Sequence, residues 1–255
     1  MKKNTKPIRP NGFTLIELLT VITVIGILIA LLFPMIKKGL AMAQHTGCIT
    51  NVRAIASGMS AYAMENEGKL PAPGWGSGAD NWLTANNTMQ VPEDVQTGLI
   101  WPFMGSQKVY RCPADSPPNP GVYAAIEAVQ NNNCYKLTSF CMNGSAICFG
   151  QNRGAYSPSI TGRKRNTLPI ELFNGDDIMI WEADETRIAA GMWWDAANFP
   201  FEGMTGRHIK WGSVAMIDGS AEKLSRDDYY NNQAPGNIGR TRLWNVPSEF
   251  SGNGH

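Results

Sequence analysis

The sequence predicts an α+β fold, in which a long N-terminal helix packs on an antiparallel, β-rich body. Two observations predict it. An apolar run over 13–36 continues into a segment with helical spacing, whereas the rest of the chain is rich in glycine, proline and asparagine. Short apolar runs between turn residues are typical of antiparallel strands. The 255 residues leave room for one medium-sized body beside the helix.

The apolar run over 13–36 is long enough to cross a membrane. Its 24 residues span about 36 Å as a helix, against about 30 Å for the hydrocarbon core. Four basic residues and no acid precede it, and Lys37 and Lys38 follow it. This difference in positive charge favours a cytoplasmic N-terminus. We therefore expect one membrane crossing, with the remainder of the chain outside the cytoplasm.

Glu17 lies inside this apolar run, where a charge costs about 2.5–3.5 kcal/mol. A secretory signal peptide is one interpretation, with a small-residue cleavage site at 41–43, but its apolar region would be about 7–15 residues long. A plain signal anchor explains the length of the run and leaves Glu17 unexplained. Glu17 also lies close enough to the helix start to reach the interface by snorkelling.

The stretch "GFTLIELLTVITVIGILIALLFP" resembles the N-terminus of type IV pilins and type II secretion pseudopilins. The resemblance extends to Pro34. It implies that a prepilin peptidase cuts after Gly12 and that the new N-terminal Phe13 is N-methylated. Glu17 then becomes the fifth residue of the mature chain, as in that family. The resemblance also implies assembly into a filament, in which Glu17 meets the α-amino group of Phe13 in a neighbouring subunit.

The segment that follows the apolar run has the spacing of an amphipathic helix. Its apolar and small positions are Leu40, Ala43, Gly47, Val52, Ile55, Met59, Tyr62 and Ala63. Gly68 and Pro71 predict its end. The resemblance implies one continuous helix kinked at Pro34, and hence a leader over 1–12, a membrane and spine helix over 13–69, and a β-rich extracytoplasmic domain over 70–255.

Later segments are similar to large pilin-like proteins of planctomycetes and verrucomicrobia. The matching positions on the helix are Cys48, Asn51, Arg53, Tyr62, Gly68 and Pro71, with Val52 where leucine is usual. "RCPADS" at 111–116 and "CMNG" at 141–144 match as well. The C-terminal motif is His208, nine intervening residues, then Asp218 and Gly219.

Strands are expected near six ranges of the body. These are 107–112, 137–142, 178–183, 187–193, 213–217 and 221–224. Asp218 and Gly219 lie between the last two and predict a two-residue type I′ hairpin turn, in which both residues have positive φ. We therefore expect Asp218 to form a turn and to have no catalytic role.

The cysteines and histidines suggest neither a metal nor another cofactor. None of the five cysteines forms a C-x-x-C pair, and no three-ligand zinc set is recognisable, because His45 and His255 lie far from His208 in sequence. We expect His208 to be exposed or to form a structural hydrogen bond. Outside the cytoplasm a disulfide is expected among four cysteines, with its pairing open. These four are Cys112, Cys134, Cys141 and Cys148.

The remaining motifs do not indicate an enzyme. There is no G-x-S-x-G elbow and no glycine-rich phosphate loop. Acids cluster around the segment "IMIWEA", where we expect solvated strand ends; a calcium loop is the alternative, although the spacing differs from an EF-hand. The acids are Asp176, Asp177, Glu182, Asp184 and Glu185. The eight tryptophans are expected in the core, with a polysaccharide-binding surface as the alternative.

A net charge of +1 and the lack of a basic run give no indication of a nucleic-acid partner. The sequence and its resemblance predict a structural subunit of a type IV pilus-like filament or a type II secretion pseudopilus. Its partners would be the prepilin peptidase and methylase, the inner membrane and other subunits. The alternative is a membrane-anchored surface module that binds a glycan or a protein without polymerising.

Overall fold

The computed structural model describes residues 13–74, 80–115, 136–147, 160–161, 164–165, 167–184, 196–208, 210–235 and 239–247. The chain divides into two compact units, Met1–Ala43 and Gln44–His255. The helix α1, Leu15–Glu65, begins in the first unit and ends in the second. The strand expected over 187–193 lies outside the described residues, as do Gly12, Cys134 and Cys148.

The first unit contains the apolar part of α1. Every described side chain from Phe13 to Ala43 is exposed, and the helix continues through Pro34. By length and composition α1 is able to cross a membrane. Proline has no amide N–H to donate within a helix, yet Pro34 lies inside α1.

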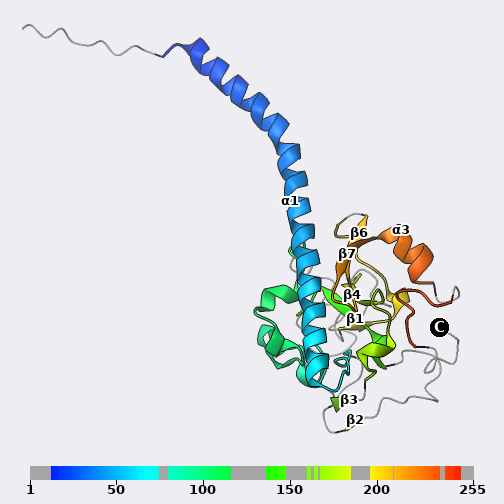
Figure 1. Cartoon of the computed structure of the whole chain (residues 1–255). Coiled ribbons are helices and arrows are strands. Elements are labelled where there is room, and N and C mark those ends of the chain that lie inside the picture. Colours follow the sequence, from blue (N-terminus) through cyan, green and yellow to red (C-terminus); the bar gives the residue numbers. More distant parts are fainter. Residues whose placement is uncertain are drawn as a thin grey trace, which may run out of the picture. The chain divides into compact units, whose positions relative to one another are not determined.

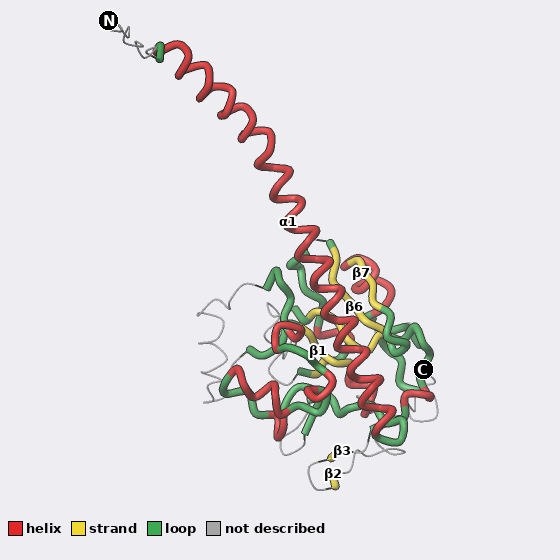
Figure 2. Tube along the Cα trace, turned by 60° about the vertical axis from the view of Figure 1, so that its left-hand side comes forward, coloured by secondary structure: helices red, strands yellow, loops and turns green. Residues whose placement is uncertain are grey.

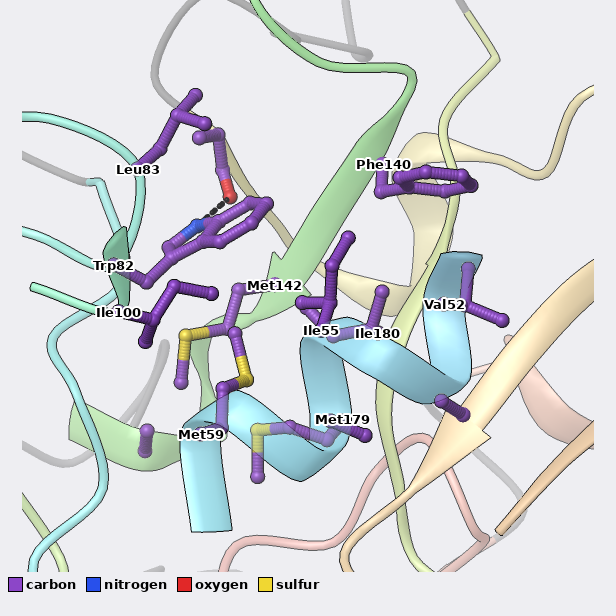
Figure 3. Close-up of a cluster of buried hydrophobic side chains, with 14 of the residues drawn as sticks. Val52, Ile55, Met59, Trp82, Leu83, Ile100, Phe140, Met142, Met179 and Ile180 are labelled. Atoms are coloured by element: carbon purple, nitrogen blue, oxygen red, sulfur yellow. Dashed lines mark hydrogen bonds between the residues drawn. The ribbon is translucent and has the colours of Figure 1, made fainter. Parts of the chain in front are cut away.

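In the second unit α1 buries one face against the sheet. Val52, Ile55 and Met59 of this face belong to one core cluster with Met142 and Ile180 of two strands. Figure 3 shows Ile55 beside Ile180 and Met59 beside Met142. These helical positions lie three or four residues apart, which places them on one side of the helix. The helix ends at Glu65, and Gly68 follows with a φ of +76°, donating its N–H to the carbonyl of Ala63. The expected helix end is therefore correct to within three residues.

Among the described residues, five strands form the main sheet, in the order β5-β1-β4-β6-β7. Figure 1 labels β1, β4, β6 and β7 of this sheet, and Figure 2 shows it beside the C-terminal part of α1. All neighbours are antiparallel except β1 and β5. The strands are β1 (Phe140–Asn143), β4 (Ile178–Glu182), β5 (Ala197–Asn198), β6 (Trp211–Met216) and β7 (Ala221–Ser225). The α+β fold with a long N-terminal helix and a mostly antiparallel sheet is confirmed.

The sheet is buried on both faces, because its side chains alternate between two core clusters. On β1, Phe140 and Met142 face the cluster that includes α1, whereas Cys141 faces the other. That second cluster is closed by Tyr229 and Leu243 from the C-terminal region. Alternation along a strand places successive residues on opposite faces. Both faces of the central strands therefore carry apolar side chains.

The other elements are short. A separate pair consists of β2 (Ile160–Thr161) and β3 (Lys164–Arg165). After β7 the chain forms α3 (Arg226–Asp228) and a π-helical turn, Tyr229–Gln233. Single 3₁₀ turns occupy Ala85–Asn87, Pro92–Thr97, Trp101–Phe103, Gln107–Tyr110, Gly144–Ile147, Ile170–Leu172 and Pro200–Glu202.

The strand expected over 107–112 is wrong, because residues Gln107–Tyr110 form a 3₁₀ turn. The side chain of Ser106 caps this turn by accepting the N–H of Lys108. The carboxamide of Asn51 on α1 then donates to the carbonyl of Arg111 at 2.8 Å. These side-chain contacts satisfy backbone groups that a strand would pair with another strand.

The hairpin between β6 and β7 is present, but the expected type I′ turn is wrong. Only Gly219 has a positive φ, +82°, and Asp218 does not. The N–H of Gly219 donates to the carbonyl of Met216, and the N–H of Met216 to the carbonyl of Ser220. A turn followed by a left-handed glycine is the common longer hairpin connection with a bulge. Asp218 accepts the N–H of Ser220 at 2.8 Å and so stabilises the loop.

Candidate functional site

The N-terminal end of α1 is organised by Glu17. Its Oε2 accepts the backbone N–H of Thr14 at 2.8 Å and the Thr14 hydroxyl at 2.7 Å, while the Thr14 Oγ1 accepts the N–H of Glu17 at 3.3 Å. This reciprocal arrangement is a capping box, for which the sequence signature is Thr-x-x-Glu. The signature is present in the motif as Thr14-Leu15-Ile16-Glu17 and identifies a second role for the acid.

The exposed apolar surface of the first unit surrounds this capped end. Phe13 is 71% exposed and Leu15 is 83% exposed, and the large apolar side chains continue exposed to Met42. Burying one such side chain is worth about 1.5–3 kcal/mol. A surface of this extent needs a cover, either lipid or other helices. Between 13 and 43, Glu17 is the sole acidic residue.

A second site lies inside the body, where four polar side chains meet. They are Cys48 on α1, Cys112 in the loop after the 3₁₀ turn Gln107–Tyr110, Glu182 at the end of β4, and His208 before β6. One ligand atom from each lies within 4.8 Å of all the others. Cys48 and Glu182 have no exposed surface, and the His208 side chain is 5% exposed.

Two side chains of this cluster lie close to the same nitrogen of His208. The Nε2 of His208 lies 3.3 Å from the Sγ of Cys112 and 3.4 Å from the Oε2 of Glu182. A cysteine–histidine–acid relay would use both ring nitrogens, one toward the thiol and the other toward the acid. Here the thiol and the acid face the same nitrogen. The geometry is that of side chains directed to a common centre.

The sheet topology brings these segments together. Because β1, β4 and β6 are antiparallel neighbours, the start of β1, the end of β4 and the start of β6 lie at the same edge of the sheet. Glu182 stands at the end of β4, opposite the start of β1 at Phe140. The loop of Cys112 is attached to this edge through Ser139, whose Oγ accepts the N–H of Cys112 at 2.9 Å.

Backbone and side-chain groups hold each member in place. The N–H of Ala114 is directed at the Sγ of Cys112, 3.4 Å away. The Oε2 of Glu182 accepts the N–H of Ser213 at 2.8 Å, and its Oε1 lies 3.4 Å from the Nη1 of Arg207. The ring of His45, one helical turn before Cys48, stacks on the ring of His208 with centroids 4.4 Å apart.

The charges of the cluster follow from this geometry. Burial alone would raise the pKa of Glu182, but the hydrogen bond and charge of His208 outweigh it and lower this pKa to about 2. Burial alone would lower the pKa of His208, and its bonds to Cys112 and Glu182 raise it to about 9. A hydrogen bond from Cys48 lowers the pKa of Cys112 to about 7, whereas burial raises that of Cys48. Without a metal the four groups form a hydrogen-bonded, partly ionised network.

The cluster was missed from the sequence because its members are separated by 64, 70 and 26 residues along the chain. No local ligand spacing therefore marks it. The two ends of the C-terminal motif do not act together. His208 belongs to the cluster, whereas Asp218 and Gly219 lie in the hairpin loop beyond β6, a strand of about 20 Å. Six of the nine intervening residues, Trp211–Met216, form β6.

Three of the acids near β4 are buried, which corrects the expectation of solvated strand ends for Asp177, Glu182 and Asp184. Asp177 and Glu182 have no exposed surface and Asp184 is 5% exposed, while Asp176 is exposed and Glu185 lies outside the described residues. The carboxylate of Asp177 lies 2.6 Å from the guanidinium of Arg240. A buried carboxylate needs such a partner to offset its lost hydration.

The structure also places the cysteines and several of the tryptophans. Cys48 and Cys112 hold free thiols. Cys141 is buried, with its Sγ 3.5 Å from the carbonyl oxygen of Trp181. A disulfide among the later cysteines stays a prediction. Trp82 and Trp181 are buried in the core, and Trp75, Trp193 and Trp194 lie outside the described residues.

Comparison with known proteins finds similarity in the N-terminal part of the chain. The family described as the prokaryotic N-terminal methylation motif matches residues 9–33. A relative from Bacillus licheniformis, the ComG operon protein 3 homolog, is 38% identical over 61 residues, which is 24% of this chain and 63% of the relative. The chain thus spans less than two thirds of that relative's length. No solved structure gives a significant match.

Proposed function

We propose that this chain, which matches the prokaryotic N-terminal methylation motif at residues 9–33 and is similar over 61 residues to a ComG operon protein 3 homolog, is a structural subunit of a pilus-like filament or a type II secretion pseudopilus. Cleavage after Gly12 would leave Phe13 as the N-terminus, followed by an N-methyl transfer. The single observation that carries the proposal is the position of Glu17 among exposed apolar side chains, at the capped start of α1.

The new α-amino group would lie one residue before the capping threonine. A positive charge at the N-terminus of a helix is unfavourable with respect to the helix dipole. The carboxylate of Glu17 in the first turn offsets it. In a filament the same carboxylate would meet the α-amino group of Phe13 in a neighbouring subunit. Such pairing offsets the cost of an acid within the membrane, so it favours helices that pack side by side.

The exposed apolar face of α1 supports the same proposal. In the membrane, lipid covers the side chains from Phe13 to Met42; in a filament, the helices of other subunits would cover them. The second unit would be carried on the extracytoplasmic side. The partners are then the prepilin peptidase, which cuts and methylates the chain, and other pilin or pseudopilin subunits.

Mass spectrometry of the purified chain tests processing. We expect a loss of residues 1–12 and the addition of one methyl group to Phe13. The Glu17→Ala variant tests assembly, because it removes the acid and keeps the cleavage site. We expect normal processing and anchoring of this variant, with at least a tenfold loss from the sheared filament fraction, since unpaired α-amino groups would oppose helix packing.

Thr23→Ala is the matched control, since the Thr23 hydroxyl only donates to the carbonyl of Leu19 in its own helix, at 2.7 Å. The control should assemble as the unchanged chain does. Normal filament levels in the Glu17→Ala variant would contradict the proposed pairing. A processed wild-type chain that forms no filament would instead indicate a singly anchored surface module.

A further inference from the structure

We propose that Cys48, Cys112, Glu182 and His208 form a structural site for Zn²⁺ that fastens the spine helix to the sheet. The ligand types fit this ion. Zinc in proteins takes thiolate sulfur, imidazole nitrogen and carboxylate oxygen, in tetrahedral sets of four. The cluster offers two sulfurs, one nitrogen and one oxygen, each within 4.8 Å of the others.

Two separations between ligand atoms agree with a tetrahedron. Bonds of about 2.0–2.3 Å to zinc place neighbouring ligand atoms about 3.3–3.8 Å apart. The Nε2 of His208 lies 3.3 Å from the Sγ of Cys112 and 3.4 Å from the Oε2 of Glu182. The widest separation, up to 4.8 Å, requires a contraction of about 1 Å as the ion enters.

The groups around the cluster suit a metal centre. Ser213 donates its N–H to Glu182 and Ala114 directs its N–H to the Sγ of Cys112, so two of the three anionic ligands are oriented by the backbone. Such outer contacts fix metal ligands in position. Two thiolates, one carboxylate and Zn²⁺ sum to a charge of −1. Arg207, 3.4 Å from Glu182 on its outer side, balances this charge.

The four ligands come from distant segments that meet at this point. Counted from the N-terminus, Cys48 is the first buried residue of α1 within the described residues. Asn51, one turn later, holds the loop of Cys112 through the carbonyl of Arg111. With four protein ligands the site is closed to substrate, as in structural zinc sites. Zinc would therefore hold α1, the loop of Cys112 and one edge of the sheet together.

A disulfide between Cys48 and Cys112 is the competing use of these thiols outside the cytoplasm. It would account for two of the four groups and leave Glu182 and His208 paired with each other at 3.4 Å. Zinc accounts for all four. As the ion binds, each cysteine thiol and the imidazolium of His208 lose a proton to solvent, and zinc bonds form to both sulfurs, to the His208 Nε2 and to the Glu182 carboxylate, with no change in oxidation state.

Zinc content of the purified full chain in detergent tests the site. After incubation with Zn²⁺ and desalting, we expect about one zinc ion per chain by elemental mass spectrometry. Co²⁺ in place of zinc should give sulfur-to-cobalt charge-transfer absorption, which Zn²⁺ then displaces. Cys48→Ser, Cys112→Ser and Glu182→Gln should each lower the retained zinc at least about tenfold, since even outer-contact variants lose that much.

Cys141→Ala is the control, because this cysteine is buried in the other core cluster. The control should keep its zinc. Where a ligand variant fails to fold, alkylation of the unchanged chain gives the answer: Zn²⁺ should protect Cys48 and Cys112 and leave the labelling of Cys141 unaltered. A folded wild-type chain with neither zinc nor cobalt–sulfur absorption would overturn the proposal in favour of a metal-free hydrogen-bonded network. A Cys48–Cys112 disulfide in the non-reduced peptide map would overturn it equally.

Discussion

The carboxylate of Glu17 accepts two hydrogen bonds from Thr14, one from its backbone N–H at 2.8 Å and one from its hydroxyl at 2.7 Å. The acid therefore has partners within its own chain before any neighbour arrives. Its role as a helix cap and its proposed role in assembly are separable, because the first depends on Thr14 and the second on the charge.

Thr14→Val removes the hydroxyl and keeps the charge of Glu17. We expect faster hydrogen exchange in the first turn of α1, by an amount that corresponds to about 0.5–2 kcal/mol for a lost cap. Filament assembly should persist, since the carboxylate remains. Exchange mass spectrometry of the full chain in detergent measures the first effect, with Thr23→Val as the control. Loss of filaments in Thr14→Val alone would show that assembly depends on the cap.

The buried carboxyl group of Glu202 makes the stability of the body depend on pH. Burial raises its pKa from 4.5 to about 7, although its bond to the N–H of Phe199 acts in the opposite direction. The folded state therefore favours the protonated carboxyl. This contribution to stability is full below pH 4.5 and is lost as the pH rises through 7. The loss is at most about 3.5 kcal/mol, since one pKa unit corresponds to about 1.4 kcal/mol.

Thermal unfolding of the full chain, followed by tryptophan fluorescence between pH 4.5 and 8, measures this dependence. The melting temperature of the Glu202→Gln variant should fall less steeply with rising pH, because glutamine cannot ionise. Some fall remains in that variant, since burial also raises the pKa of Asp177 to about 6. Parallel curves for the two proteins would contradict the assignment to Glu202.

Gly98 lies where no larger residue fits. A Cβ at this position would meet the carbonyl oxygen of Leu83 at 2.3 Å and that of Trp82 at 2.7 Å. Both are backbone atoms, and Trp82 is anchored by its indole N–H on the carbonyl of Ala196 at 2.9 Å (Figure 3). Gly98→Ala should therefore lower the unfolding free energy by about 1–3 kcal/mol. The matched control is Gly105→Ala, where nothing lies within 4 Å. Equal melting temperatures for the two variants would refute the prediction.

Gly219 is the left-handed residue of the β6–β7 hairpin, with a φ of +82°. No atom lies within 4 Å of the position that a Cβ would take. Gly219→Ala should lower the unfolding free energy by about 1 kcal/mol through backbone strain alone. Gly219→Asn should lower it less, because asparagine tolerates this conformation better. Melting temperatures of the two variants provide the comparison. An alanine variant as stable as the unchanged chain would show that the loop rearranges.

The sequence by itself determined the N-terminal processing motif, the apolar run and the long helix. The apolar run, Gly12, Phe13 and Glu17 lie within one stretch of contiguous residues, and the helical spacing from Val52 to Ala63 is a local property as well. The strands β4, β6 and β7 were predictable for the same reason, since period and turn residues are read over a few positions. The capping box was also readable, as Thr-x-x-Glu.

Only the tertiary structure decided what His208 does. Its partners Cys48, Cys112 and Glu182 come from separate elements, and their meeting depends on the strand order and on the face that α1 presents to the sheet. The turn at Gln107–Tyr110 also depends on tertiary contacts, because the carboxamide of Asn51 on α1 donates a hydrogen bond to the carbonyl of Arg111 just after it. Local sequence preferences are fixed by neighbours along the chain, whereas a buried polar cluster is fixed by antiparallel pairing between segments far apart in sequence. The start of β1, the end of β4 and the start of β6 share one edge for that reason, and this edge holds the cluster.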